Sequence, residues 1–222
     1  MASLRLYTLD QSGNSYKVRL LAALLGITLE LIEVDMANDE LHSPEFLAMN
    51  PRAQIPVLVV GDKTFTDSAA ILVYLAGSYP DVGSTKTPSS FWSNDIAEQA
   101  AIVDWLAFAT GWIHNGVSGA RKVLNFPAKG FSMNDPLGPP TLETATAVGY
   151  KSLAMLQTRL CTNEWLALGR PTIADIAVFV YVALAHMGNI SLDPYPAVKS
   201  WISRFKDLPG FIPMIGIDGP KH

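Results

Sequence analysis

A proline stands at the start of the run Pro56-Val57-Leu58-Val59-Val60, which otherwise has the composition of a central β-strand. Proline has no N–H to give to a neighbouring strand, so it is normally confined to sheet edges, strand starts and bulges. A cis bond between Ile55 and Pro56 resolves this conflict, because it turns the N–H and C=O of Ile55 away from the sheet, where an extended peptide can pair with them. The alternative is a trans proline at the first residue of the strand.

Strand-like and helix-like segments alternate through the first eighty residues. Alternating or short apolar runs predict strands over 4–9, 28–34, 56–60 and 63–65. Helices are predicted where capping residues precede apolar periodicity: from the turn residues 10–14 to Gly26, from Ser43-Pro44 to Asn50-Pro51, and from Asp67-Ser68 to about 78. The predicted order is therefore β-α-β-α-β-β-α.

The rest of the chain is predicted to be helical. Pro, Gly, Ser and Thr dominate residues 79–90, and helical spacing of apolar residues follows over 97–113, 141–160 and 196–208. Thr172 and Asp175 form a capping box before another apolar helix, and a long loop is predicted over 126–140. The expected organisation is an α/β domain over 1–80, a linker over 81–90 and an all-α domain over 91–222.

Composition excludes several classes of function. Apolar residues make up 49% of the chain, the net charge is −4 and no basic block is present, which argues against nucleic acid as a partner. The apolar run 176–185 has about half of the ~20 residues that a membrane span needs. Because the first residues lack the order of a secretory signal, we expect a cytoplasmic protein. One cysteine and scattered histidines predict neither a disulfide within the chain nor a metal site.

Two helix starts carry residues suited to binding and chemistry. At the start of the helix that Asp67 and Ser68 open, free N–H groups, the helix dipole and a hydroxyl favour a small carboxylate. Residues 12–15, Ser-Gly-Asn-Ser, place hydroxyl and amide donors where a thiolate can be stabilised. Ordinary helix capping explains the same residues at both places.

Taken together, these segments resemble the glutathione transferases. The motifs that carry the resemblance are Ser12-Gly13-Asn14-Ser15-Tyr16-Lys17-Val18-Arg19, Asn50-Pro51-Arg52-Ala53-Gln54-Ile55-Pro56-Val57-Leu58, Asp67-Ser68-Ala69-Ala70-Ile71 and Thr172-Ile173-Ala174-Asp175. The resemblance implies a thioredoxin-like N-terminal domain followed by an all-helical C-terminal domain. It also implies glutathione as the co-substrate and a homodimer.

The resemblance assigns roles to individual residues. It implies that Ile55, with Gln54 and Pro56, pairs with the cysteinyl part of glutathione, and that Asp67 and Ser68 hold the γ-glutamyl carboxylate. His42 is a candidate for the glycine carboxylate, or simply part of a solvated helix face. Asp104 is a candidate for the γ-glutamyl amine bound in the neighbouring subunit, or an exposed acid on a long helix.

The sulfur is expected beside the first-helix loop, where Ser12, Asn14 and Ser15 are the candidate catalytic residues. Similar bacterial sequences carry cysteine where Ser15 stands, so thiol chemistry on the protein itself is not expected. An electrophile site is predicted along Trp105, Phe108 and Trp112, which are alternatively core or dimer interface.

The function implied is conjugation of the glutathione thiolate to small apolar electrophiles, as in detoxification. Two alternatives stay open. One is a glutathione-dependent disulfide reductase, and the other is a non-catalytic binding protein with the same fold.

Overall fold

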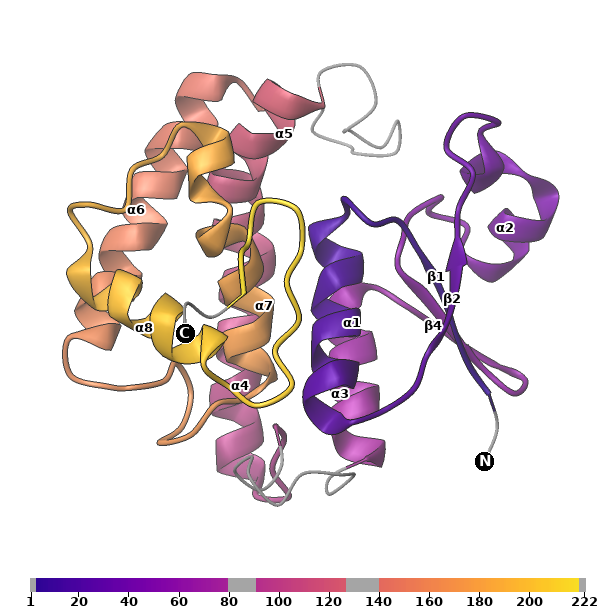
Figure 1. The fold of residues 1–222 in the computed structure, drawn as a ribbon, viewed down its shortest axis with the longest axis horizontal. Helices are drawn as coiled ribbons and strands as arrows, with labels where there is room; N and C mark the ends of the chain where they lie inside the picture. The colour runs from indigo at the N-terminus through magenta and orange to yellow at the C-terminus, as the bar shows by residue number, and fades with distance from the viewer. Residues whose placement is uncertain (1–2, 80–90, 127–139, 220–222) are drawn as a thin grey trace.

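The computed structural model describes residues 3–79, 91–126 and 140–219. Figure 1 shows a sheet toward one side of the molecule and a bundle of helices on the other. Helices α1 (Gly13–Leu25) and α3 (Ser68–Ser78) lie between the sheet and the bundle, where both contact α7 (Ile173–Ala183). The predicted linker over 81–90 and residues 127–139 of the predicted loop lie outside the described residues. This architecture confirms the predicted fold class, an α/β domain followed by an all-α domain.

The sheet has four strands in the order β2-β1-β3-β4. Strand β2 runs parallel to β1, whereas β3 is antiparallel to both β1 and β4. The strands are β1 (Leu4–Thr8), β2 (Glu30–Glu33), β3 (Val57–Val60) and β4 (Lys63–Thr66). With the helices α1 (Gly13–Leu25), α2 (Pro44–Met49) and α3 (Ser68–Ser78), they form the predicted β-α-β-α-β-β-α order, and a short 3-10 turn, η1 (Glu40–His42), precedes α2.

The helical part packs around one buried helix. It comprises α4 (Ile96–Phe108), the π-helix η2 (Ala109–Ser118), α5 (Gly119–Asn125), α6 (Leu142–Leu160), α7 (Ile173–Ala183), the 3-10 turn η3 (Ala185–Gly188) and α8 (Pro196–Lys206). Residues 173–182 of α7 are all buried, which is why this helix reads as continuously apolar in the sequence. Among the described residues, no helix is long and apolar enough to cross a membrane.

The helix predicted over 97–113 extends further than expected. From Ile96 it continues through η2 and α5 to Asn125 without an interruption. Gly111, Asn115 and Gly116 weaken the apolar period there, so the pattern stops before the helix does. A tertiary contact requires glycine at one of these positions. A Cβ atom on Gly116 would lie 2.7 Å from the backbone nitrogen of Gly149 in α6. The backbones of η2 and α6 therefore approach each other closely at this point.

Replacing Gly116 with alanine is expected to lower the free energy of unfolding by about 2 kcal/mol, because the added methyl group meets backbone rather than a movable side chain. Gly111→Ala is the matched control in the same π-helix, since a Cβ there has no atom within 4 Å. That control should leave stability unchanged or raise it slightly. Urea denaturation of the two variants measures the difference, and equal stabilities would contradict the close approach.

Candidate functional site

Sheet topology brings the three predicted site segments to one end of the sheet. Tyr7 pairs with Val57 across β1 and β3, and Val57 pairs with Thr66 across β3 and β4. Because β3 runs opposite to both neighbours, the end of β1, the start of β3 and the end of β4 lie at the same end of the sheet. Ser12 follows β1, Ile55 precedes β3 and Asp67 follows β4. The structure therefore brings these three residues to one end of the sheet.

The loop before β3 is shaped by Asn50. Its side-chain nitrogen donates to the carbonyl oxygen of Gln54 at 2.7 Å, and its Oδ1 accepts from the N–H of Arg52 at 3.1 Å. The Ile55–Pro56 peptide bond is cis, as the sequence predicts. Ile55 is half-buried, and none of its backbone groups is hydrogen-bonded to another residue in the described ranges.

The start of α3 combines an exposed aspartate with a buried serine residue. Asp67 caps the helix, accepting from the N–H of Ala69 at 2.8 Å, and its backbone lies in the left-handed region with φ of 72°. Such a φ is uncommon for residues other than glycine, and Asp is among those that adopt it most readily. Ser68 is 7% exposed. The helix start thus offers N–H groups and a carboxylate side by side.

The start of α1 places the three candidate catalytic residues in different surroundings. Ser12 is half-buried and caps the helix, accepting from the N–H of Ser15 at 3.2 Å. Ser15 is fully buried, and its hydroxyl has no hydrogen-bond partner among the described residues. Asn14 is half-buried, and its Oδ1 accepts from Nζ of Lys17 at 3.0 Å. Ser12 and Asn14 are the two that are not enclosed by protein.

Lys17 is a component that the sequence reasoning missed. It is only 5% exposed, and its ammonium lies 4.9 Å from the centre of the Tyr181 ring, a cation–π contact. Burial lowers the pKa of Lys17 to about 8, Asp67 opposes that change and Lys122 adds to it. No sequence signal pointed to it, because the ring that covers it, Tyr181, comes from the distant helix α7.

The helical domain covers this end of α1. Arg121 in α5, also 5% exposed, donates to the carbonyl oxygen of Gln11 at 3.2 Å. Tyr181 in α7 lies directly on Gly13, where an added Cβ would be 2.7 Å from a ring carbon. Burial raises the pKa of Tyr181, so it stays a neutral phenol here. The candidate thiol site is thus closed on one side by residues of α5 and α7.

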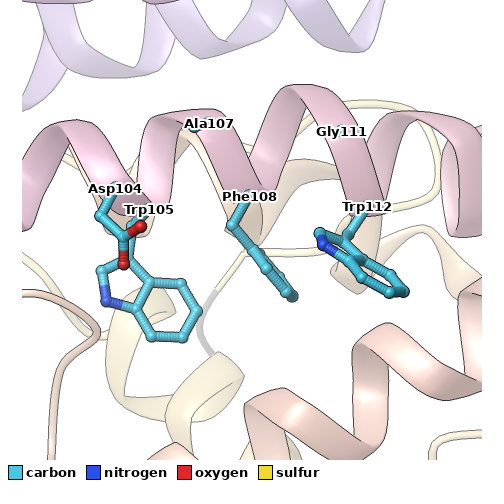
Figure 2. Close-up of a pocket in the computed structure, with 6 residues that line it drawn as sticks. All are labelled: Asp104, Trp105, Ala107, Phe108, Gly111 and Trp112. Atoms are coloured by element: carbon cyan, nitrogen blue, oxygen red, sulfur yellow. The ribbon is translucent and has the colours of Figure 1, made fainter.

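The predicted electrophile residues form an aromatic row on one helix face. Figure 2 shows Trp105, Phe108 and Trp112 projecting from the same side of the helix, with Asp104 beside them. The ring centres are 5.1 Å apart for Trp105 and Phe108 and 6.4 Å apart for Phe108 and Trp112. An open pocket of about 300 Å³ lies along this row, lined also by Ala107 and Gly111. Asp104 and Trp112 are exposed.

His42 lies directly before α2 rather than within it. It belongs to the 3-10 turn η1 that precedes α2, is exposed, and its Nδ1 lies 2.7 Å from Oδ1 of Asp39. Within residues 3–79, 91–126 and 140–219, no group of His, Cys, Asp and Glu side chains is arranged to hold a metal ion.

Comparison with known proteins agrees with this geometry. The family model described as "Glutathione S-transferase, N-terminal domain" matches residues 2–77, and the one described as "Glutathione S-transferase, C-terminal domain" matches residues 140–209. A solved structure of a possible glutathione S-transferase from Rhodopseudomonas palustris is 33% identical, with a TM-score of 0.79 and coverage of 94% of this chain and 96% of that one.

The names of the curated relatives describe more than one activity. Glutathione S-transferase D7 of Anopheles gambiae is 28% identical over 202 residues, which cover 91% of this chain and 85% of the relative. Disulfide-bond oxidoreductase YfcG of Escherichia coli is 28% identical over 203 residues, covering 88% and 87%. The two domain matches together span most of the chain, and they fall on the α/β domain and on the helical bundle. The chain therefore belongs to the glutathione S-transferase family.

Proposed function

We propose that this chain is a cytoplasmic glutathione transferase that joins the glutathione thiolate to small apolar electrophiles, a reaction suited to detoxification. The observation that carries the proposal is that Ser12, Ile55 and Asp67 all lie at one end of the sheet. Each offers a different kind of partner: a helix start for the sulfur, unpaired backbone for the cysteinyl unit, and a second helix start for the γ-glutamyl carboxylate.

In the proposed complex glutathione lies extended across this end of the sheet. Ile55, flanked by Gln54 and Pro56, pairs with the cysteinyl backbone, and Ser68 binds the γ-glutamyl carboxylate with Asp67 nearby. His42 is proposed to reach the glycine carboxylate, which its exposure in η1 permits. The sulfur then lies by Ser12 and Asn14. Because Ser15 is enclosed, its part in the proposal is to shape the turn.

The chemistry needs no general base from the protein. The reference pKa of a thiol is about 8.5, so each unit by which hydrogen-bond donors lower it raises the thiolate fraction up to tenfold at neutral pH. With an aryl halide, the sulfur attacks the ring carbon, a C–S bond forms and halide leaves. We propose that Trp105, Phe108 and Trp112 provide the apolar surface for the electrophile.

Calorimetry and turnover assays on the purified chain test this function. We expect saturable binding of reduced glutathione and conjugation of an aryl halide that follows the ionisation of the bound thiol. Absence of glutathione binding would overturn the proposal. Binding without turnover of any electrophile would instead support the non-catalytic alternative.

A second candidate is glutathione-dependent disulfide reduction, which the similarity to a disulfide-bond oxidoreductase favours. The single cysteine of the chain, Cys161, is exposed beside the end of α6 rather than in the α1 loop. Any exchange at the α1 loop must therefore use the glutathione thiolate: it attacks a mixed disulfide of glutathione, the S–S bond breaks, glutathione disulfide forms and the substrate leaves as a thiol. Faster turnover of a mixed disulfide than of the aryl halide would select this candidate.

We also propose a homodimer. Ile96 is 77% exposed and Val103 49% exposed on α4, which is unusual for large apolar side chains on one helix. A second copy covering this face would place its Asp104 near the glutathione amine. Light scattering tests the assembly, and a monomer at micromolar concentration would remove Asp104 from the proposed site.

A further inference from the structure

Asn14 and Lys17 form a hydrogen-bonded pair in the first turn of α1. Nζ of Lys17 donates to Oδ1 of Asn14 at 3.0 Å. A lysine ammonium carries only donors, whereas a side-chain amide carries an oxygen that accepts and a nitrogen that donates. The pairing therefore fixes which way round the amide lies: the oxygen of Asn14 faces Lys17, and Nδ2 faces away from it.

Lys17 is held firmly enough to keep this orientation. It is 5% exposed and lies over the Tyr181 ring, and the charges that act on it are Asp67 at the start of α3 and Lys122 in α5. Among the described residues, Asn14 is the hydrogen-bond partner of its Nζ. Because an unpaired buried ammonium is costly, the bond to Asn14 is the arrangement that burial enforces.

The other end of the amide is left for a ligand. Asn14 is half-buried, and its Nδ2 donates to no other residue in the ranges that the structure describes. This nitrogen lies at the helix start where the proposed function places the sulfur of glutathione. An amide turned the other way would present its oxygen there, which would repel a thiolate.

We propose that Lys17 is a positioning residue for the glutathione thiol: by holding Oδ1 of Asn14, it directs Nδ2 of Asn14 to the sulfur. The inference rests on the proposed function, because it requires glutathione in the α1 loop. The bound thiol releases its proton to water, and an Nδ2–H donates to the thiolate that remains. Neither Asn14 nor Lys17 gives up or takes a proton in this step.

A double-mutant cycle on the full-length protein tests the inference. Asn14→Ala, Lys17→Met and the combined variant are saturated with glutathione, and the thiolate is followed by its ultraviolet absorbance as the pH rises. Each single change is expected to raise the pKa of the bound thiol by about one unit, which lowers the thiolate fraction at neutral pH by up to tenfold. The combined variant should fall no further, because Lys17 acts through Asn14. Lys17→Arg keeps charge and donors and should stay close to the unaltered protein.

The outcomes separate the two proposals. If the unaltered protein does not bind glutathione, the proposed function fails. If it binds and ionises glutathione but Lys17→Met leaves the titration unchanged, the inference is wrong while the function stands. A tenfold loss on adding Lys17→Met to Asn14→Ala would also overturn it, since Lys17 would then act on the sulfur directly by its charge.

Two further variants control for the possibility that Lys17→Met disturbs the fold. Lys199→Met makes the same chemical change on an exposed lysine that pairs with Asp193 on the surface, and no change in the titration is expected. Lys17→Gln is measured beside Lys17→Met, because its amide can offer Asn14 either a donor or an acceptor and so loses the fixed orientation. A folded Lys17→Gln protein with an unaltered thiolate titration would contradict the inference independently of the methionine variant.

Discussion

Replacing Asp175 with alanine is expected to lower the free energy of unfolding by about 4 kcal/mol, a large part of the stability of an ordinary domain. Asp175 is fully buried, and its carboxylate accepts from four donors. They are the N–H groups of Leu166 and Thr172, the Thr172 hydroxyl and the indole N–H of Trp201, at 2.9 to 3.2 Å. Alanine leaves all of these donors buried without a partner, and each costs about 1–3 kcal/mol.

Urea denaturation above pH 7 measures this effect, because burial raises the pKa of Asp175 to about 6 and the carboxylate is then mostly ionised. Asp193→Ala is the matched control, since Asp193 is exposed and its carboxylate pairs with the exposed Lys199 at the surface. Its cost should stay below about 0.5 kcal/mol. If the two alanine variants were equally stable, the buried carboxylate could not be what joins α7, α8 and the loop before α7.

Features encoded by neighbouring residues could be predicted from the sequence. The box formed by Thr172 and Asp175, the Ser43 cap and the left-handed Gly26 each depend on residues within one turn, and the structure confirms them. The conflict between Pro56 and its strand is likewise local, so the cis bond could be expected before any tertiary contact was known.

Features that depend on distant partners could not be predicted in this way. Lys17 reads as a solvated position until Tyr181 from α7 covers it. Gly116 reads as a weak point in a helical pattern until Gly149 from α6 packs on it. In each case the partner is more than thirty residues away in the chain. Neither periodicity nor capping preference carries information about such pairings.

Replacing Asp67 with asparagine is expected to weaken glutathione binding about thirtyfold. The γ-glutamyl unit carries a carboxylate and an ammonium group on one carbon atom, so a carboxylate bound at Ser68 brings the ammonium within reach of Asp67. A hydrogen bond between charged groups contributes about 2 kcal/mol, which corresponds to that factor. Asparagine also caps helices and also adopts positive φ, so the start of α3, with φ of 72° at residue 67, should keep its shape.

Calorimetry with S-methylglutathione is the sharpest measurement, because Asp67 also acts on Lys17 and a blocked sulfur removes any contribution from thiol ionisation. Asp62→Asn is the matched control, since Asp62 lies in the exposed turn at the other end of the β3–β4 hairpin and should leave affinity unchanged. A glutathione analogue without the α-amino group should bind the unaltered protein and the Asp67→Asn variant equally well. If that analogue lost as much affinity as S-methylglutathione, Asp67 would serve the shape of the helix start rather than the ammonium group.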